Sequence, residues 1–192
     1  MKMNKSNCEK AEMLVEVLPY VNRFRDKIIV IKYGGNAMIN EDLKKAVMQD
    51  LLLMKSVGMH PILVHGGGPA INDMLKKLKV ESHFEQGLRV TDKETMEIVE
   101  MVLAGKVNKD IVGTLNQIGG KGIGLSGKDG NLIQARKKYL EKNGEKIDIG
   151  YVGEVEAVNK EMLESLIYSG YIPVISSIGM GKDGMSYNIN AD

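Results

Sequence analysis

The chain has 192 residues, and its 26 Lys and Arg nearly balance its 25 Asp and Glu. This length suits one good-sized domain that buries roughly 70% of its unfolded surface, and the balanced charge gives no reason to expect nucleic acid or a membrane as a partner. Cys8 is the single cysteine, so an internal disulfide is excluded, which fits a reducing cytosol. No apolar run approaches the about 20 residues that span a bilayer. The first residues also lack the apolar core of a signal peptide. We therefore expect a soluble cytoplasmic protein.

The first predicted element is a helix that begins after Ser6. Ser6 and Glu9 have the spacing of a capping box, and Pro19 is expected to bend the helix. Its apolar residues form two stripes, with Ala11, Leu14, Val15, Leu18 and Val21 on one and Met13, Val17, Tyr20 and Phe24 on the other. One sheet face covers only one side of a helix, so the second stripe either meets a partner subunit or folds back onto its own domain. The periodicity favours neither.

Four consecutive β-branched residues, Ile28–Ile31, follow the helix. Such a run is typical of a strand buried on both faces in the middle of a parallel sheet. Lys32 stands at its end, before Gly34 and Gly35, where ligands of open α/β sheets bind. Glycine lets the backbone turn its amides toward a ligand, and lysine is a point charge suited to phosphate. A surface lysine before a tight turn is the alternative, and this segment alone does not decide between them.

A second strand ends on the same kind of turn. Pro61–His65 is followed by Gly66–Gly68 and by Pro69, which suits the first turn of a helix. The glycine amides therefore lie at a helix N-terminus, where anions bind. Between the two strands, a helix capped by Asn40 ends at Gly58. This order predicts a parallel sheet with helices on its faces, with a phosphate on one turn and a carboxylate or second phosphate on the other.

The segment Phe84–Asp92 reads as a short hairpin or an extended loop. Arg89 lies there between apolar neighbours that would hold it still, and arginine binds carboxylates with two hydrogen bonds. A surface arginine is the alternative, which the glycine turns make less attractive. Asp92 is expected to cap a helix that runs through Leu103, and a separate helix is expected from about residue 106 to 118.

The last third of the sequence predicts more strands. We expect a strand over Ile123–Ser126, a turn at Lys128–Asn131, a returning strand over Leu132–Ala135, a further extended arm over Gly150–Val158, a helix ending at Gly170, and a strand over Tyr171–Ser176 that leads into the small-residue turn Ser176–Gly179. The final residues, Tyr187–Asp192, alternate like a strand and stop on a helix-capping residue. We therefore expect the sequence to be part of a longer protein.

The sequence lacks residues that three familiar kinds of site require. A Walker loop needs Ser or Thr after its lysine, whereas Lys128 is followed by Asp129. Gly34–Ala37 does not supply the dinucleotide fingerprint G-x-G-x-x-G. His65–Gly68 looks like the oxyanion turn of some esterases, but the required G-x-S-x-G is missing its last glycine at Gly124–Lys128.

Five segments together resemble the amino acid kinase superfamily, and most closely those members that phosphorylate N-acetyl-L-glutamate. They are Ile31–Met38, Val64–Pro69, Gly87–Thr91, Val174–Gly179 and Asn188–Asp192. The resemblance runs from about Leu14 to the last residue. The glycine turns are shared across the superfamily, whereas their combination with G-L-R-V-T and N-x-N-A-D is much more specific.

The resemblance implies an α/β fold, a three-layer αβα sandwich around a mainly parallel sheet. Residues 1–26 would be an N-terminal helical extension, residues 27–176 an acceptor-substrate-binding αβα domain and residues 177–192 the start of a nucleotide-binding domain. Family members continue for about a further hundred residues, a typical domain's worth. The chain would therefore be truncated before most of the nucleotide-binding domain, and by itself it is expected to be inactive.

The implied activity is transfer of the γ-phosphoryl of ATP to the side-chain carboxylate of N-acetyl-L-glutamate, the second step of arginine biosynthesis. Mg²⁺ would arrive with ATP, and no protein metal site is expected. The product would be N-acetyl-L-glutamyl 5-phosphate. Two alternatives stay open: a related kinase acting on carbamate, aspartate, glutamate or UMP, and a non-catalytic amino-acid-binding regulatory module.

The resemblance also implies roles for individual residues. Lys32 would neutralise the transferring phosphoryl group beside the Gly34 and Gly35 amides, and Asp192 would orient lysine ammonium groups. Gly67 and Gly68 would hold the acceptor through their backbone, and Arg89 would bind its α-carboxylate. Asn188 and Asn190 would supply side-chain hydrogen bonds. The N-terminal helix resembles an extra helix of arginine-inhibited, hexameric members. It therefore implies a homo-oligomer, either a dimer or a hexamer formed through this helix, with arginine as a feedback inhibitor.

Overall fold

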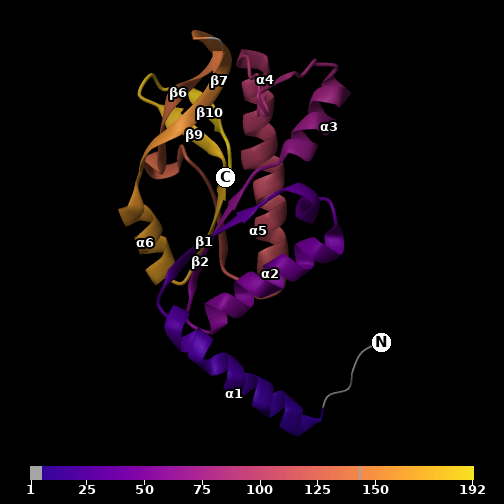
Figure 1. The fold of residues 1–192 in the computed structure, drawn as a ribbon, viewed down its shortest axis with the longest axis vertical. Helices are drawn as coiled ribbons and strands as arrows, with labels where there is room; N and C mark the ends of the chain where they lie inside the picture. Colours follow the sequence, from indigo (N-terminus) through magenta and orange to yellow (C-terminus); the bar gives the residue numbers. More distant parts are fainter. Residues whose placement is uncertain (1–5, 143) are drawn as a thin grey trace.

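A four-stranded parallel sheet lies at the centre of the fold, in a computed structural model that describes residues 6–142 and 144–192 (Figure 1). Its strands, in spatial order, are β1 (Ile28–Tyr33), β2 (His60–His65), β8 (Ile172–Ser176) and β5 (Gly122–Ser126). Their last residues are in register, so Tyr33, His65, Ser176 and Ser126 lie in one row across the sheet. The loops after these strands therefore open at the same edge.

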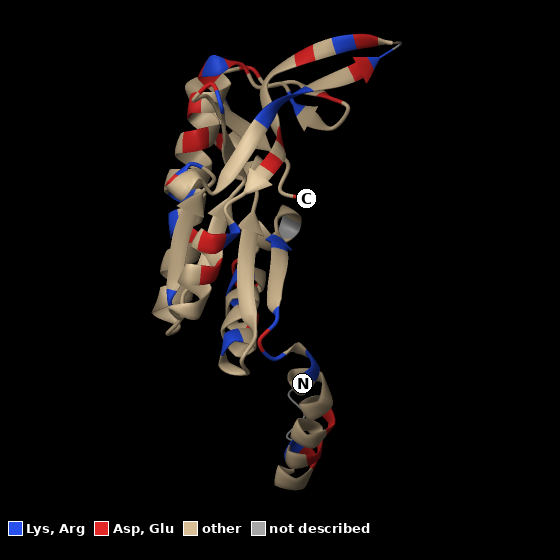
Figure 2. Cartoon of the chain, turned by 90° about the vertical axis from the view of Figure 1, so that its left-hand side faces the viewer, with Lys and Arg blue, Asp and Glu red and all other residues tan. Residues whose placement is uncertain are grey.

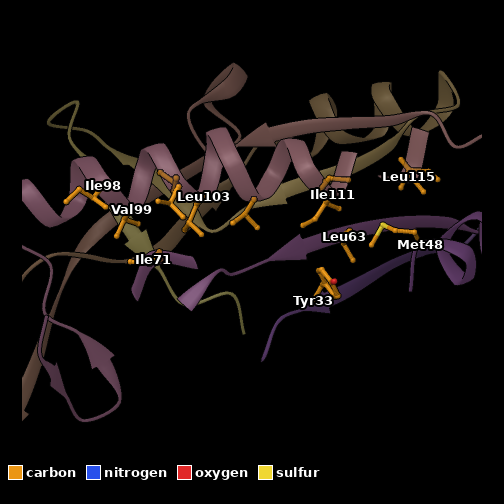
Figure 3. Close-up of a cluster of buried hydrophobic side chains, with 14 of the residues drawn as sticks. Tyr33, Met48, Leu63, Ile71, Ile98, Val99, Leu103, Ile111 and Leu115 are labelled. Carbon is orange, nitrogen blue, oxygen red and sulfur yellow. The ribbon is translucent and has the colours of Figure 1, made fainter. Parts of the chain in front are cut away.

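Helices cover both faces of this sheet, which confirms the predicted three-layer sandwich. On one face α2 (Glu41–Ser56), α3 (Gly68–Leu78) and a long helix enclose the larger core, in which Leu63 of β2 is fully buried (Figure 3). On the other face α6 (Lys160–Tyr168) packs Ile167 against Ile175 of β8. The predicted helix caps at Asn40 and Asp92 are present, because each side chain accepts hydrogen bonds from first-turn amides.

The long helix replaces the two separate helices that the sequence predicts, and that prediction is wrong. It consists of α4 (Lys93–Glu100), the π-helical segment η2 (Met101–Val107) and α5 (Asn108–Gln117). At both junctions the backbone stays right-handed helical, with Met101 at φ −57° and ψ −43° and Asn108 at φ −57° and ψ −48°. Buried side chains continue across the junctions, so packing holds the helix together where the sequence pattern is interrupted.

A second sheet, a closed four-stranded barrel, lies beside the first. It contains β6 (Ile133–Lys142), β7 (Glu145–Val158), β9 (Ile178–Gly181) and β10 (Ser186–Ile189). The predicted hairpin arm at 150–158 is confirmed, since β7 pairs antiparallel with β6. β9 and β10 complete this barrel with β6 and β7, and the division at residue 176 into acceptor-binding and nucleotide-binding parts stays a prediction.

One local prediction in this region is wrong, and another is inexact. Leu132–Ala135 does not return beside β5, because β5 pairs with β8 while β6 joins the barrel. The chain crosses there very closely: a Cβ on Gly127 would lie 2.1 Å from the Ile178 carbonyl oxygen. The predicted turn over Ser176–Gly179 is shorter than expected, since Ser177 alone separates β8 from β9.

β1 is an edge strand, so the prediction that it is central and buried on both faces is wrong. Ile28 and Val30 are 42% and 64% exposed. Within the described ranges, the helices of one layer cover only the face of β1 that carries Ile31 and Tyr33. A run of β-branched residues therefore marks the strand correctly but overstates its burial.

The N-terminal helix, α1 (Asn7–Phe24), points away from the rest of the molecule (Figures 1 and 2). Its predicted capping box is present, it continues through Pro19, and none of its residues, all of them described, is buried. The alternative in which it folds back onto its own domain is therefore wrong for this structure. Residues 1–5 of the predicted extension lie outside the described residues. No helix in the described ranges is long and apolar enough to cross a membrane.

Candidate active site

A cavity of about 440 Å³ opens above the carboxyl ends of the parallel strands. All residues that received a predicted role line it, from both glycine turns, the 84–89 hairpin and the segment from β10 to the end of the chain: Lys32, Gly34, Gly35, Gly67, Gly68, Arg89, Asn188, Asn190 and Asp192. Residues far apart in the sequence therefore meet in one place, although their roles stay predictions.

The turn after β1 is held by an ion pair. Lys32 Nζ lies 2.7 Å from Asp192 Oδ1, and the two side chains are 46% and 64% exposed. Gly35, at φ +62°, begins the 3₁₀ turn η1 (Gly35–Met38), and the Tyr33 hydroxyl donates to the Ala37 carbonyl at 2.9 Å. Burial, and then the nearby Glu41, raise the pKa of Tyr33 to about 12, so this hydroxyl keeps its proton at neutral pH.

The turn after β2 leads directly into α3. Pro69 lies in the first turn of this helix, as predicted. A Cβ on Gly67 would lie 2.5 Å from Leu103 Cδ2, so the π-helical segment approaches the turn as closely as a glycine permits. In the described part of the chain, the Gly67 and Gly68 N–H groups donate to no protein acceptor, as is usual for the first amides of a helix. They are available to an anion.

Arg89 lies on the predicted hairpin, formed by β3 (Phe84–Glu85) and β4 (Leu88–Arg89). It is 6% exposed, its Nη1 donates to Ser82 Oγ, and its Nη2 donates to Asn72 Oδ1 at 2.6 Å. The guanidinium carbon lies 4.6 Å from the centre of the Phe84 ring. Burial lowers the pKa of Arg89, but arginine keeps its charge in proteins. Among the described residues, no carboxylate forms an ion pair with this buried cation.

Thr91 connects Arg89 with Asn188. Its hydroxyl donates to the Arg89 carbonyl at 2.8 Å and accepts from Asn188 Nδ2 at 3.4 Å. Thr91 is fully buried and lies inside the G-L-R-V-T segment, so the sequence marked the segment but not this role. The Asn190 side chain accepts from the Asp192 backbone N–H at 3.3 Å, which closes a local turn at the cavity wall.

Sequence reasoning missed several residues of the site. Asn72 and Ser82, which hold Arg89, come from α3 and the loop that follows it, and no local motif contains them. Ser177 is 5% exposed and lines the cavity, and the sequence marked its segment, Val174–Gly179, but gave this residue no role. These residues are recognisable only once the fold has placed them.

Charge and hydrogen-bond donors dominate the chemistry of the cavity. It offers two cationic side chains, Arg89 and the Asp192-paired Lys32, and the Gly67 and Gly68 amides, which have no acceptor among the described residues. This set suits a ligand with more than one negative charge. No group of three or more His, Cys, Asp or Glu gathers anywhere in the ranges that the structure describes.

Comparisons with known proteins agree with these features. The sequence pattern of the amino acid kinase family matches residues 27–192. Acetylglutamate kinase from Caldicellulosiruptor bescii is 62% identical over 184 residues, which are 96% of this chain and 63% of that protein. The chain therefore spans about 63% of the length of this curated relative.

Solved structures show the same architecture. The crystal structure of smu.665 from Streptococcus mutans UA159 matches with a TM-score of 0.73 at 34% identity, covering 85% of this chain and 64% of that one. N-acetylglutamate synthase from Neisseria gonorrhoeae, complexed with coenzyme A and N-acetyl-glutamate, matches with a TM-score of 0.78 at 21% identity, covering 97% of this chain and 41% of that one. The second likeness concerns the fold alone.

Proposed function

The chain belongs to the amino acid kinase family, and we propose that the full-length protein transfers the γ-phosphoryl of ATP to the side-chain carboxylate of N-acetyl-L-glutamate. One observation carries this proposal: a buried arginine without a carboxylate partner in the described residues shares a cavity with two unpaired amides at a helix N-terminus. A buried cation is costly unless it is paired, so this arrangement favours an anionic ligand. The name of the relative that is 62% identical identifies a fitting acceptor.

The acceptor would bind through its charged ends. Arg89, already held by Asn72 and Ser82, would bind the α-carboxylate with its remaining N–H groups. The Gly67 and Gly68 amides would hold the acceptor from the helix end, and Asn188, with Asn190, would supply side-chain hydrogen bonds. All of these groups line one cavity, which supports a proposal in which they hold the acceptor in a fixed position.

The transfer itself needs no strong base, since the acceptor carboxylate is ionised at neutral pH. A carboxylate oxygen attacks the γ-phosphorus, the bond from phosphorus to the β–γ bridging oxygen breaks, and ADP leaves with that electron pair. Lys32 would neutralise charge on the transferring group, with the Gly34 and Gly35 amides beside it, and Asp192 would orient the Lys32 ammonium. ATP would bring Mg²⁺ bound to its phosphates.

A coupled assay of ADP release by the full-length protein tests this proposal. N-acetyl-L-glutamate should be the preferred acceptor over glutamate, aspartate, carbamate and UMP. Preference for unacetylated glutamate would contradict the acceptor assignment, and calorimetric binding of an amino acid without ATP-dependent turnover would indicate a regulatory module instead. The 192-residue chain by itself should bind the acceptor without measurable turnover.

We also propose that α1 mediates homo-oligomerisation, as a dimer or hexamer, and that arginine inhibits the full-length protein. In support, α1 exposes large apolar side chains on a helix that touches no core cluster, with Leu14 and Val15 at 73% and 69% exposure. Deleting residues 1–24 should lower the mass measured by light scattering and remove arginine inhibition. An unchanged assembly would contradict the proposal.

A further inference from the structure

His65 is the last residue of β2, directly before the second glycine turn, and it is completely buried. Both of its ring nitrogens are engaged. Nδ1 lies 2.9 Å from the Gly66 carbonyl oxygen, and Nε2 lies 3.0 Å from Nδ2 of Asn108, the first residue of α5. Neither residue lines the cavity, so neither touches a ligand there.

The partners of Asn108 decide which end of its side chain faces the imidazole. Asn108 Nδ2 lies 2.9 Å from the Val174 carbonyl oxygen, and a carbonyl can only accept, so the group facing it must be the NH₂. On the opposite side, Lys109 Nζ donates to Asn108 Oδ1 at 3.2 Å. A Cβ on Gly124 would lie 1.9 Å from Asn108 Oδ1, so the glycine allows the amide to lie against β5.

This orientation determines the protonation of the imidazole. Since Asn108 Nδ2 donates to Nε2, that nitrogen must be the unprotonated acceptor. A neutral ring then carries its proton on Nδ1, which donates to the Gly66 carbonyl. A second proton on Nε2 would face the Asn108 NH₂ group, and burial already disfavours a charged ring.

The Gly66 carbonyl and the Gly67 N–H belong to the same peptide unit. The described chain has no cis peptide bond, and in a trans peptide these two groups point in opposite directions. When His65 holds the carbonyl, the Gly67 N–H therefore points away from the imidazole. It has no acceptor in the described protein, and Gly67 lines the cavity.

We infer that His65, held as the Nδ1–H tautomer by Asn108, is a positioning residue that aims the Gly67 amide at the carboxylate of the acceptor. This inference rests on the proposed function for the identity of the ligand. The group that binds the acceptor would be the Gly67 backbone amide, and His65 would act behind it by holding the Gly66 carbonyl of the same peptide unit. If Nδ1 lost its proton, the ring would face the Gly66 carbonyl with a lone pair, and the peptide would rotate.

The tautomer is tested without any ligand. In the full-length protein with ¹⁵N-labelled histidine, ring-nitrogen NMR at pH 7 should show one histidine with Nδ1 protonated and Nε2 bare. His65→Gln should remove this signal, which assigns it. A His65 ring protonated on Nε2, alone or together with Nδ1, would overturn the inference whether or not N-acetylglutamate binds.

Two matched substitutions test the consequence. In His65→Asn the short amide occupies the place of Nδ1 and can donate to the Gly66 carbonyl, whereas in His65→Gln the longer amide reaches Asn108 and lacks that donor. We expect His65→Gln to raise the Kd for N-acetylglutamate about 10- to 100-fold, the range for a lost hydrogen bond to a charged group.

His65→Asn should bind N-acetylglutamate nearly as tightly as the wild type. The melting temperatures of both variants distinguish a variant that is unfolded from one in which only the Gly67 amide is misdirected. Equal losses of affinity in two variants of equal stability, or no loss in His65→Gln, would overturn the inference. Failure of the wild-type protein to bind N-acetylglutamate would contradict the proposed function instead, and the ring-nitrogen spectrum would still decide the state of His65.

Discussion

The two glycine turns look alike in the sequence but differ in their surroundings. The turn after β1 is held by the exposed ion pair between Lys32 and Asp192, and a Cβ on Gly35 would meet no atom within 4 Å. The turn after β2 is wedged against Leu103 and held by the buried His65. An exposed ion pair contributes little rigidity, whereas a buried, fully hydrogen-bonded network gives a single geometry. The turn after β2, which is proposed to hold the acceptor, is therefore the more rigid of the two, and the turn after β1, which is proposed to face the phosphoryl group, is the more adjustable.

The largest effect should come from the adjustable turn. Lys32→Ala in the full-length protein should lower kcat by about 100- to 1,000-fold, because the Lys32 charge is proposed to act on the transferring phosphoryl group, whose negative charge reorganises in the transition state. The KM for N-acetylglutamate should change little. Steady-state kinetics with both substrates measure this, and an effect confined to KM would show that Lys32 binds the acceptor rather than the transferring group.

Arg89 lies on the β3–β4 hairpin and is proposed to bind the acceptor, so its removal should act on binding. Arg89→Ala should raise the KM for N-acetylglutamate about 10- to 100-fold, since a charge-assisted contact contributes about 1.5–3 kcal/mol. Arg89→Lys should restore charge but not the bonds to both Asn72 and Ser82, and should recover only part of the loss. Equal kcat losses in Arg89→Ala and Lys32→Ala would contradict the assignment of Arg89 to acceptor binding and of Lys32 to the transfer step.

Methyl groups added to the second turn compare packing directly. Gly67→Ala should lower the free energy of unfolding by about 1–3 kcal/mol, because the new Cβ would lie 2.5 Å from Cδ2 of Leu103, a buried side chain of the larger core. Gly68→Ala, with nothing within 4 Å of the same atom, is the matched control and should cost much less. Urea unfolding followed by circular dichroism measures both. Similar midpoints for the two variants would mean that the second turn is not wedged.

The smallest effect concerns pH. Burial lowers the pKa of His65, and this outweighs the opposing effect of the Gly66 carbonyl. As pH falls below about 6.5, the unfolded chain takes up a proton that the folded chain refuses, so stability should fall toward acid pH. Urea midpoints at pH 7.5 and 5.5 test this, and His65→Asn should flatten the decline. A wild-type midpoint that rises on acidification would contradict the sign.

The sequence revealed those parts of the site that depend on local chemistry. Three features could be recognised from short local patterns, each with its own physical reason. They are the glycines after apolar strands, the helix cap at Asp92 and the arginine of the hairpin. It did not reveal Asn72 or Asn108, because an asparagine on a helix face is uninformative until tertiary contacts bring a guanidinium or an imidazole to it.

The same distinction explains the errors in the fold. Residues 101–107 contain a glycine and an interrupted apolar stripe, which read as a break, yet buried side chains on both sides keep the helix continuous. The segment Leu132–Ala135 follows a turn and reads as a returning strand, yet its pairing partners lie on β7 and β9. Strand pairing depends on which other strands the fold brings beside a segment, and a single sequence does not show this.

The π-helical segment makes the length of the long helix critical. An α-helix bonds each N–H to the carbonyl four residues earlier, whereas in this segment the bond reaches five residues back, as from the Asn108 N–H to the Leu103 carbonyl. The segment therefore holds one residue more than an α-helical turn of the same span, and Asn108 lies beside His65 with that residue accommodated. With the same number of residues but α-helical bonds, α5 would turn about its axis and Asn108 would leave His65, so the length of the segment and its π-helical bonds act together.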